Sequence, residues 1–228
     1  MKKVVKLIFR QFGYAVVKEI DSIDLQTTLK SLSKKKEIKV IYDIGANNGK
    51  YGMKNLREIF PTALIYAFEA NHVHFPYPDG LYNSAFQICL SDKDNVELDF
   101  FMNNTTGDSF FQEATPYYEN IKPKPVLTLT LDSTRQELSI PEPDLIKIDV
   151  QGAELLILQG AVHTIKNTRY LILELSLFEY NLHAPKISEI LSFLEEQSFY
   201  PTKIVEQHLI DTVIIQLDLL FEHRKRPL

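Results

Sequence analysis

The chain has 228 residues, of which 45% are hydrophobic and 24% charged, and this composition favours one packed domain over a disordered chain. Its net charge of -5 and sequence pI near 5.7 argue against nucleic-acid binding through bulk positive charge. The single cysteine, Cys89, excludes an internal disulfide framework and a cysteine-rich zinc site, so we expect a reduced, cytoplasmic setting.

The N-terminal part of the chain is expected to be a helical extension, residues 1–36, that packs on a main domain of residues 37–228. Its apolar residues recur at helical spacing with lysines between them. A helix that makes peripheral contact with a membrane surface is the alternative, because the same pattern is amphipathic. Lys6 and Arg10 interrupt the apolar run, so we predict neither a signal peptide nor a transmembrane segment.

The rest of the chain alternates short apolar runs with segments of helical pattern, which predicts an α/β fold with a doubly wound, mostly parallel sheet. The last two runs are joined by a short link, which is typical of an antiparallel hairpin. The expected strands are 38–43, 64–68, 86–90, 145–150, 170–175, 200–205 and 212–221, and the expected helices are 21–30, 49–60, 154–165 and 186–197.

The middle of the chain departs from this pattern. Residues 96–102 and 126–131 alternate between apolar and polar side chains, which indicates two half-exposed strands. The polar segment 103–125 lies between them and is long for a loop in a compact domain, so we interpret it as a lid or substrate-facing insertion. Its four aromatic residues, Phe110, Phe111, Tyr117 and Tyr118, either stack on a bound ring or pack the loop down.

The turn after the first expected strand is the strongest functional signal. Asp43, Gly45 and Gly49 follow an apolar run, as in proteins that hold a nucleoside at the carboxyl end of a parallel strand. A dinucleotide site usually has three glycines in a fixed frame, and here Asn47 takes the first glycine place. The Asp-x-Gly form suits S-adenosylmethionine better, because an acid attracts its ammonium group. NAD stays open on these residues alone.

Two further strand ends support a nucleoside site. Glu69 lies 20 residues after Gly49, where an acid accepts hydrogen bonds from ribose hydroxyls in either cofactor. Ser91 and Asp92 follow the third expected strand, where Asp92 would accept from the adenine amine. A turn or helix cap is the alternative at Ser91 and Asp92.

Charged residues also occur near the ends of two later strands. Strand alternation puts Lys147 and Asp149 on one face, and Glu174 follows an apolar run in the next strand. Such charges are costly in a buried strand unless they are paired or used. They therefore indicate either a structural ion pair or a site beside the transferred group.

Together these segments resemble the FkbM family of S-adenosylmethionine-dependent methyltransferases. The resemblance covers about residues 38–221, and Gln151 departs from it because the family usually has glutamate there. The segments that carry it are YDIGANNG at 42–49, AFEAN at 67–71, LIKIDVQGAE at 145–154, LELS at 173–176 and QLDLLF at 216–221.

The resemblance implies a Rossmann-like class I methyltransferase fold: a seven-stranded, mostly parallel sheet with an antiparallel C-terminal hairpin and helices on both faces. It implies methyl transfer to a hydroxyl of a sugar, a glycolipid or polysaccharide precursor, or a polyketide-like small molecule. The residues expected to hold S-adenosylmethionine are Asp43, Gly45, Ala46, Asn47, Gly49, Glu69, Ala70, Asn71, Ser91, Asp92 and Asp149.

Methylation of a poor nucleophile such as an aliphatic hydroxyl needs help to remove its proton. The candidate catalytic residues are Asp149 with its neighbour Lys147, Glu174, and His183. His183 lies in a loop after the fifth expected strand of the parallel sheet, and it also fits a plain surface histidine. We do not expect a metal; a Mg²⁺ ion, if bound, would be held by Asp149 and Glu174. An NAD(P)-dependent oxidoreductase and a non-catalytic cofactor-binding partner protein are the alternatives.

Overall fold

The computed structural model describes residues 23–35, 37–49, 53–75, 77 and 80–224. The expected N-terminal helix, with its alternative of membrane contact, lies outside these residues. The later part of the expected extension forms α2, Leu25–Lys35, which packs on α3, Met53–Ile59. Asp24 accepts the Thr27 N–H at 2.6 Å and so begins α2. The sequence predicted this helix over 21–30, so both its predicted start and its predicted end lie before the observed ones.

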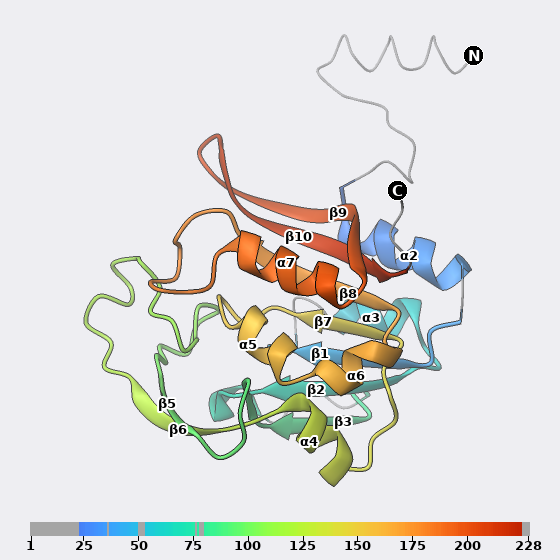
Figure 1. Cartoon of the computed structure of the whole chain (residues 1–228), viewed down its shortest axis with the longest axis horizontal. Coiled ribbons are helices and arrows are strands. Elements are labelled where there is room, and N and C mark those ends of the chain that lie inside the picture. The colour runs from blue at the N-terminus through green and yellow to red at the C-terminus, as the bar shows by residue number, and fades with distance from the viewer. Residues whose placement is uncertain (1–22, 36, 50–52, 76, 78–79, 225–228) are drawn as a thin grey trace, which may run out of the picture.

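The described residues form a sheet of seven strands in the order β3-β2-β1-β7-β8-β10-β9 (Figure 1). Every neighbouring pair from β3 to β8 is parallel, and β10 runs antiparallel to both of its neighbours. This confirms the predicted fold class, including the antiparallel hairpin. The strands are β1 Val40–Ile44, β2 Leu64–Glu69, β3 Ser84–Gln87, β7 Leu145–Ile148, β8 Tyr170–Ser176, β9 Phe199–Ile210 and β10 Val213–His223.

Helices cover both faces of the sheet, and each face has its own apolar core. One core includes α4, α5, α6 and α7, while the other includes α2 and α3 (Figure 1). Because side chains alternate along a strand, Tyr42 and Ile44 point to the first core and Ile41 to the second. The bounds of the first group of helices are α4 Leu131–Glu137, α5 Glu154–Gln159, α6 Val162–Asn167 and α7 Ile187–Glu196.

The same alternation decides where the charged strand residues point. Asp43, Lys147, Glu174 and Asp218 each alternate with residues of the first core, so all four lie on the face of the second core. The strand register pairs Asp43 with Lys147 and Glu174 with Asp218. A row of charged groups therefore crosses one face of the sheet near the carboxyl ends of its parallel strands.

Two expected elements differ from the structure, and one helix was not expected. The third expected strand, 86–90, is divided between β3 and β4, Cys89–Leu90, and β4 belongs to a second sheet. The expected helix 154–165 is two helices, because Gly160 lies between them and packs against the Ser91 carbonyl, where a Cβ would be 2.1 Å away. The helix α4 was not expected; Thr130 caps it by accepting the Ser133 N–H.

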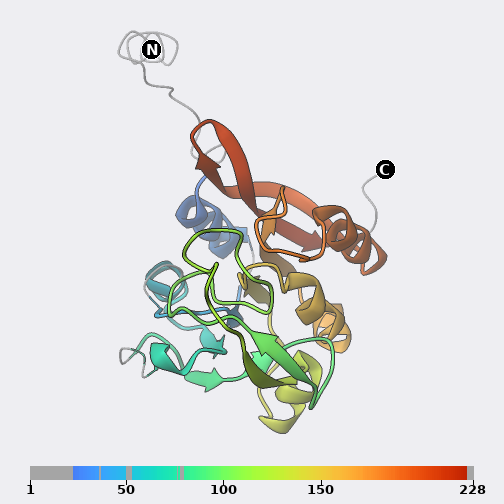
Figure 2. The same cartoon turned by 90° about the vertical axis from the view of Figure 1, so that its left-hand side faces the viewer.

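The second sheet has the order β4-β6-β5 and supports the long polar loop. Its central strand is β6, Lys124–Leu129, and one of its outer strands is β5, Glu97–Phe100; both were expected as half-exposed strands. The segment between them lies across the carboxyl ends of the parallel strands of the main sheet (Figure 2). The expected insertion is therefore close to the row of charged groups.

The turn at Gly45 brings two strand ends together. Gly45 has φ of +76°, and a Cβ there would lie 1.9 Å from the Asp149 carbonyl oxygen. Glycine is needed because the backbone after β7 occupies that space, and not because a ligand does. Since β1 and β7 flank the point where the strand order reverses, this contact also fixes the position of the crevice above it.

We predict that Gly45→Ala destabilises the protein far more than Gly80→Ala. Both glycines have positive φ, but a Cβ at Gly80 meets nothing within 4 Å. Gly80→Ala should cost about 1 kcal/mol of unfolding free energy from backbone strain, and Gly45→Ala about 1–3 kcal/mol more from overpacking. Urea unfolding measures both, and equal losses would contradict the proposed steric contact with Asp149.

Candidate active site

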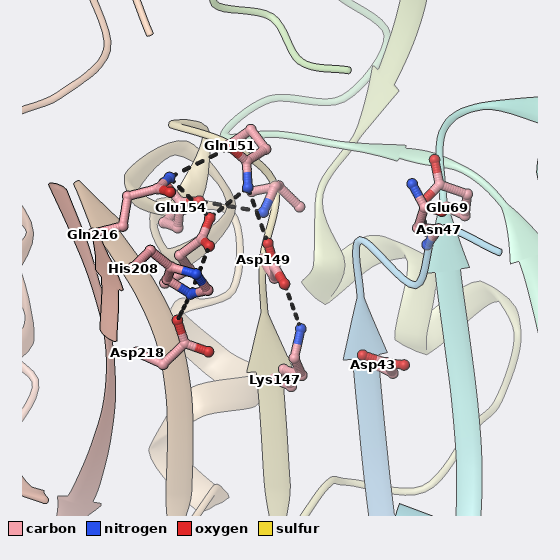
Figure 3. A network of polar contacts seen from close by, with 12 residues as sticks. Asp43, Asn47, Glu69, Lys147, Asp149, Gln151, Glu154, His208, Gln216 and Asp218 are labelled. Atoms are coloured by element: carbon pink, nitrogen blue, oxygen red, sulfur yellow. Dashed lines mark hydrogen bonds and ion pairs between the residues drawn. The ribbon is translucent and has the colours of Figure 1, made fainter. Parts of the chain in front are cut away.

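A cavity of about 390 Å³ lies over the carboxyl ends of β1, β2, β7 and β8. It extends from the Asp43–Asn47 turn and Glu69 at one end to His208 and Asp218 at the other. In Figure 3 the labelled groups follow one another in this order across neighbouring strands. One continuous space therefore touches both the expected cofactor residues and the charged row.

The turn at the cofactor end is organised by one carboxylate. Glu69 accepts the N–H of Asn47 on one oxygen and the N–H of Asn71 on the other, each at 2.8 Å. Burial raises the pKa of Glu69, and the two backbone donors oppose that rise. Each carboxylate oxygen keeps a lone pair, so Glu69 remains able to accept from a bound ligand's hydroxyls.

Asp43 lines the cavity and has an unused acceptor. Its Oδ2 accepts the Tyr82 hydroxyl at 3.0 Å, while its Oδ1 is buried without a hydrogen-bond partner in the described part of the chain. Burial raises the pKa of Asp43, and the neighbouring Lys147 opposes this. An orphaned, buried carboxylate oxygen fits a ligand that brings a positive group, as the ammonium of S-adenosylmethionine does.

The structure brings most of the expected cofactor residues to the cavity, but not all. Asp43, Gly45, Ala46, Asn47, Glu69, Ala70 and Asp149 line it. Asn71 instead anchors the polar loop, donating to Asp108 at 2.7 Å. Gly49 closes the turn by donating to the Ala46 carbonyl at 3.0 Å and is not part of the lining.

Ser91 and Asp92 are also absent from the cavity lining. Ser91 donates its hydroxyl to Asp92, and Asp92 pairs with Lys93 at 3.5 Å. The residues just before them, Cys89 and Leu90, line the cavity instead. The division of the expected third strand into two explains the difference, because β4 turns away into the second sheet before Ser91.

Lys147 and Asp149 form a buried ion pair at 2.7 Å. Burial alone would lower the pKa of Lys147, but the charges of Asp149 and Asp43 outweigh it and raise the pKa above its ordinary value. Burial pushes the pKa of Asp149 upward, and Lys147 outweighs this and holds it below its ordinary value. Both groups are therefore charged at neutral pH, and Asp149 is a weak base.

Glu174, His208 and Asp218 form a second polar group, here called the Glu–His–Asp cluster. The Nε2 atom of His208 lies 3.3 Å from Asp218 Oδ1 and 3.5 Å from Glu174 Oε1. The hydrogen bond to Asp218 raises the pKa of His208, although partial burial opposes it. Burial, followed by the charges of Asp149 and Asp218, raises the pKa of Glu174 to about 10.

Two glutamine amides hold Glu174 in place. Gln151 and Gln216 both donate to its Oε2 atom, and Gln151 also donates to Asp149 Oδ1 at 3.3 Å. Gln151 has φ of +57° in the tight turn after β7, which aims its side chain between the two carboxylates. The glutamine at the position where the resembled family usually has glutamate thus acts as a hydrogen-bond donor.

Sequence reasoning missed His208, Asp218 and Gln216 as site residues. They lie on the hairpin strands β9 and β10, which come last in the chain, and only the pairing of β10 with β8 brings them beside Glu174. The signal available in the sequence was Asp218, a charge within an apolar strand. His183, expected as a candidate base, has 91% of its side chain exposed and does not line the cavity.

The polar loop between β5 and β6 forms one wall of the cavity. Asn47 donates to the Thr105 carbonyl at 3.2 Å, which ties this loop to the turn after β1. Tyr118 is buried within the loop, and its hydroxyl donates to Asp108 at 2.7 Å. Of the loop aromatics, Phe110 lines the cavity, whereas Tyr117 is 78% exposed.

Comparison with known proteins supplies a family. A family model described as "Methyltransferase FkbM domain" matches residues 43–200, which confirms the resemblance. The 2-O-methyltransferase NoeI of Sinorhizobium fredii is 27% identical over 219 residues, covering 84% of this chain and 86% of NoeI. The hexuronic acid methyltransferase AglP of Haloferax volcanii is 26% identical over 157 residues, covering 63% of this chain and 59% of AglP, less than two thirds of its length.

Solved structures with a similar arrangement are more distant in sequence. The structure of Methyltransferase FkbM from Methylobacillus flagellatus KT is 13% identical with a TM-score of 0.49, covering 79% of this chain and 43% of that one. The magnesium protoporphyrin IX methyltransferase (ChlM) of Synechocystis PCC 6803 is 12% identical with a TM-score of 0.49, covering 98% of this chain and 97% of that one.

None of the helices in the described ranges has the length and apolar content that a membrane crossing requires.

We predict that Glu69→Ala weakens binding of S-adenosylhomocysteine by about ten-fold or more, because a charged acceptor is lost, at about 1.5–3 kcal/mol. Glu69→Gln keeps the side-chain volume and should fall between this variant and the wild type. Glu97→Ala removes an exposed carboxylate of β5 and serves as the control. Isothermal titration calorimetry measures the affinities, and an unchanged affinity in Glu69→Ala would remove this residue from the cofactor site.

We also predict that the stability difference between wild type and Glu174→Gln depends on pH. In the unfolded chain Glu174 ionises near 4.5, whereas in the folded chain it keeps its proton up to about 10, so folding takes up a proton between these values. Stability from the protonated group is complete below 4.5 and is lost as the pH rises toward 10. The amide imitates the protonated acid and does not titrate.

The wild type should therefore lose stability relative to Glu174→Gln by at least about 1 kcal/mol between pH 6 and pH 9. Urea unfolding in the presence of EDTA at the two pH values measures this change. A stability gap that stays constant with pH would show that Glu174 is ionised in the folded protein.

Proposed function

Because the chain belongs to the FkbM family of S-adenosylmethionine-dependent methyltransferases, we propose that it methylates a hydroxyl oxygen of a sugar. The printed names of two relatives support a sugar acceptor, one a 2-O-methyltransferase and the other a hexuronic acid methyltransferase. The residues alone left two alternative functions open, an NAD(P)-dependent oxidoreductase and a non-catalytic cofactor-binding partner protein. Membership of a methyltransferase family argues against both. The observation that carries the proposal is the single cavity that joins the Asp43–Asn47 turn to the Glu–His–Asp cluster.

The cofactor would lie at the end of the cavity near β1 and β2. Asp43 would accept from its ammonium group through the unpaired Oδ1, and Glu69 from its ribose hydroxyls. Cys89 and Leu90 would provide an apolar wall for the adenine. S-adenosylmethionine supplies a methyl group on a sulfonium, which is already a strong methyl donor.

The acceptor would enter at the end of the cavity formed by β8, β9 and β10. Its oxygen forms a bond to the methyl carbon as the carbon–sulfur bond breaks, and the hydroxyl proton must leave. The Glu–His–Asp cluster is placed to promote that loss, since Asp149 is neutralised by Lys147. Holding the two reactants in line and excluding water supplies much of the rate, and the loop wall contributes to both.

A sugar or glycan acceptor suits the chemistry of this end of the cavity. Gln216 and Glu206 supply polar groups for ring hydroxyls, while Phe110 and Tyr180 supply aromatic faces. Free sugars and sugars that are part of a glycolipid or polysaccharide precursor form one acceptor class in this proposal. We also propose a cytoplasmic location, since Cys89 is a free thiol. Burial raises the pKa of this thiol to about 12.

We expect S-adenosylhomocysteine, but not NAD, to raise the thermal unfolding temperature. A panel of sugar nucleotides, uronic acids and oligosaccharides should contain an acceptor whose mass increases by one methyl group. With that acceptor, His208→Gln should lower kcat by about 100-fold or more, with S-adenosylhomocysteine affinity within about three-fold. The control is His163→Gln, which changes an exposed histidine of α6 remote from the cavity lining.

Stabilisation by NAD and not by S-adenosylhomocysteine would overturn the cofactor assignment. Methylation of nitrogen or carbon in place of a hydroxyl would overturn the reaction type. An unchanged kcat in His208→Gln would exclude the Glu–His–Asp cluster from the reaction.

A further inference from the structure

We propose that Glu174, His208 and Asp218 form a binding site for one divalent transition-metal ion. The three ligands come from the adjacent strands β8, β9 and β10. Glu174 and Asp218 are direct register partners, and His208 pairs with Gln216, two residues from Asp218 on the same face. The positions of all three side chains are therefore fixed by the sheet and not by a loop, as a preorganised metal site requires.

The two distances from the His208 ring nitrogen to the carboxylates are compatible with a shared metal ion. A single ring nitrogen carries either one proton or one lone pair, so His208 Nε2 serves one carboxylate at most by hydrogen bonding. Yet it lies 3.3 Å from Asp218 and 3.5 Å from Glu174, and the three ligand atoms lie within 4.8 Å of one another. A tetrahedral ion with bonds of about 2.0–2.2 Å keeps its ligand atoms about 3.3–3.6 Å apart.

The surroundings orient the ligands in the manner of a metal site. Gln151 and Gln216 both donate to Glu174 Oε2, which leaves Oε1 directed at His208. Such contacts behind the ligands fix their geometry and tune metal affinity. Glu174 is 8% exposed and Asp218 is 5% exposed, so both carboxylates are largely removed from water.

The charge balance at this end of the cavity leaves room for a cation. Among the described residues that line the cavity, Lys147 is the only lysine or arginine, and its ammonium is paired with Asp149 at 2.7 Å. The ion pairs that Glu174 and Asp218 make within the described ranges are with His208 alone. Two buried acids thus share one imidazole, and a divalent cation that displaces the Glu174 proton would neutralise both carboxylates.

The ligand set narrows the metal and its role. One imidazole with two carboxylates suits Zn²⁺ or Mn²⁺, and three protein ligands leave positions open toward the cavity. The sequence led us to expect no metal and offered Asp149 and Glu174 as the ligands if Mg²⁺ were bound; the proposed site excludes Asp149, because Asp149 is paired with Lys147. Its role rests on the proposed function: the acceptor oxygen binds the ion, its proton passes to solvent, and the oxygen then takes the methyl group as the carbon–sulfur bond breaks.

The test titrates Mn²⁺ and Zn²⁺ into the 228-residue chain after it has been stripped with EDTA and dialysed. We expect one equivalent to bind, with Mn²⁺ followed by electron paramagnetic resonance and Zn²⁺ by calorimetry. Glu174→Gln, Asp218→Asn and His208→Gln should each weaken binding by about ten-fold or more. The matched control is Glu206→Gln, which removes the carboxylate register-paired with Asp218 and should change affinity by less than about three-fold.

A spectroscopic measurement separates the proposed ligands from general loss of charge. Bound Mn²⁺ should show electron spin echo modulation from a coordinated imidazole nitrogen, and His208→Gln should abolish it while Glu206→Gln keeps it. Circular dichroism on each variant checks that the fold is retained. Absence of stoichiometric binding to the wild type, or equal affinity in all variants, would overturn the site.

Binding of S-adenosylhomocysteine is measured on the same samples so that the two proposals fail separately. If the cofactor product binds and neither metal does, the metal site is wrong and the methyltransferase proposal stands. If metal binds without any methylated product from the acceptor panel, the metal site stands and its role on an acceptor hydroxyl falls.

Discussion

The ion pair between Lys147 and Asp149 is the interaction on which the site depends. Lys147 lies in the middle of the sheet, in register with Asp43 and two residues before Asp149. Its ammonium is therefore the positive charge next to both carboxylates. Without that charge, the carboxylates of Asp43 and Asp149 would lack a neighbouring lysine or arginine among the described residues, which is costly for acids removed from water. The pair thereby allows a polar crevice to form on an otherwise apolar core.

Gln151 extends this arrangement toward the acceptor end of the cavity. Its amide donates to both Asp149 and Glu174, which joins the neutralised pair to the Glu–His–Asp cluster. A glutamate at this position would place a third carboxylate between two others. The departure from the resembled family therefore makes local sense, because a donor replaces a charge where charges already crowd together.

Much of the fold was readable because its signals are local. Apolar runs and glycine turns predicted the strands of the parallel sheet and the C-terminal hairpin, and the structure confirms them. The errors occurred where a tertiary contact overrides the local pattern. Residues 86–90 read as one strand, but their two halves pair with different partners, and Gly160 interrupts a helical pattern because the backbone at Ser91 leaves no space for a side chain.

The sequence by itself determined the family and the cofactor, because several separate segments together resemble FkbM methyltransferases and the family model confirms the resemblance. It also predicted the Asp43–Asn47 turn and Glu69 as cavity residues, since these lie close together in the chain. Only the tertiary structure decided the acceptor end. His208 and Asp218 are separated from Glu174 by more than thirty residues, and antiparallel pairing of β10 with β8 and β9 sets them beside it. Strand register is a property of the whole sheet, and no spacing in the sequence encodes it for a distant pair.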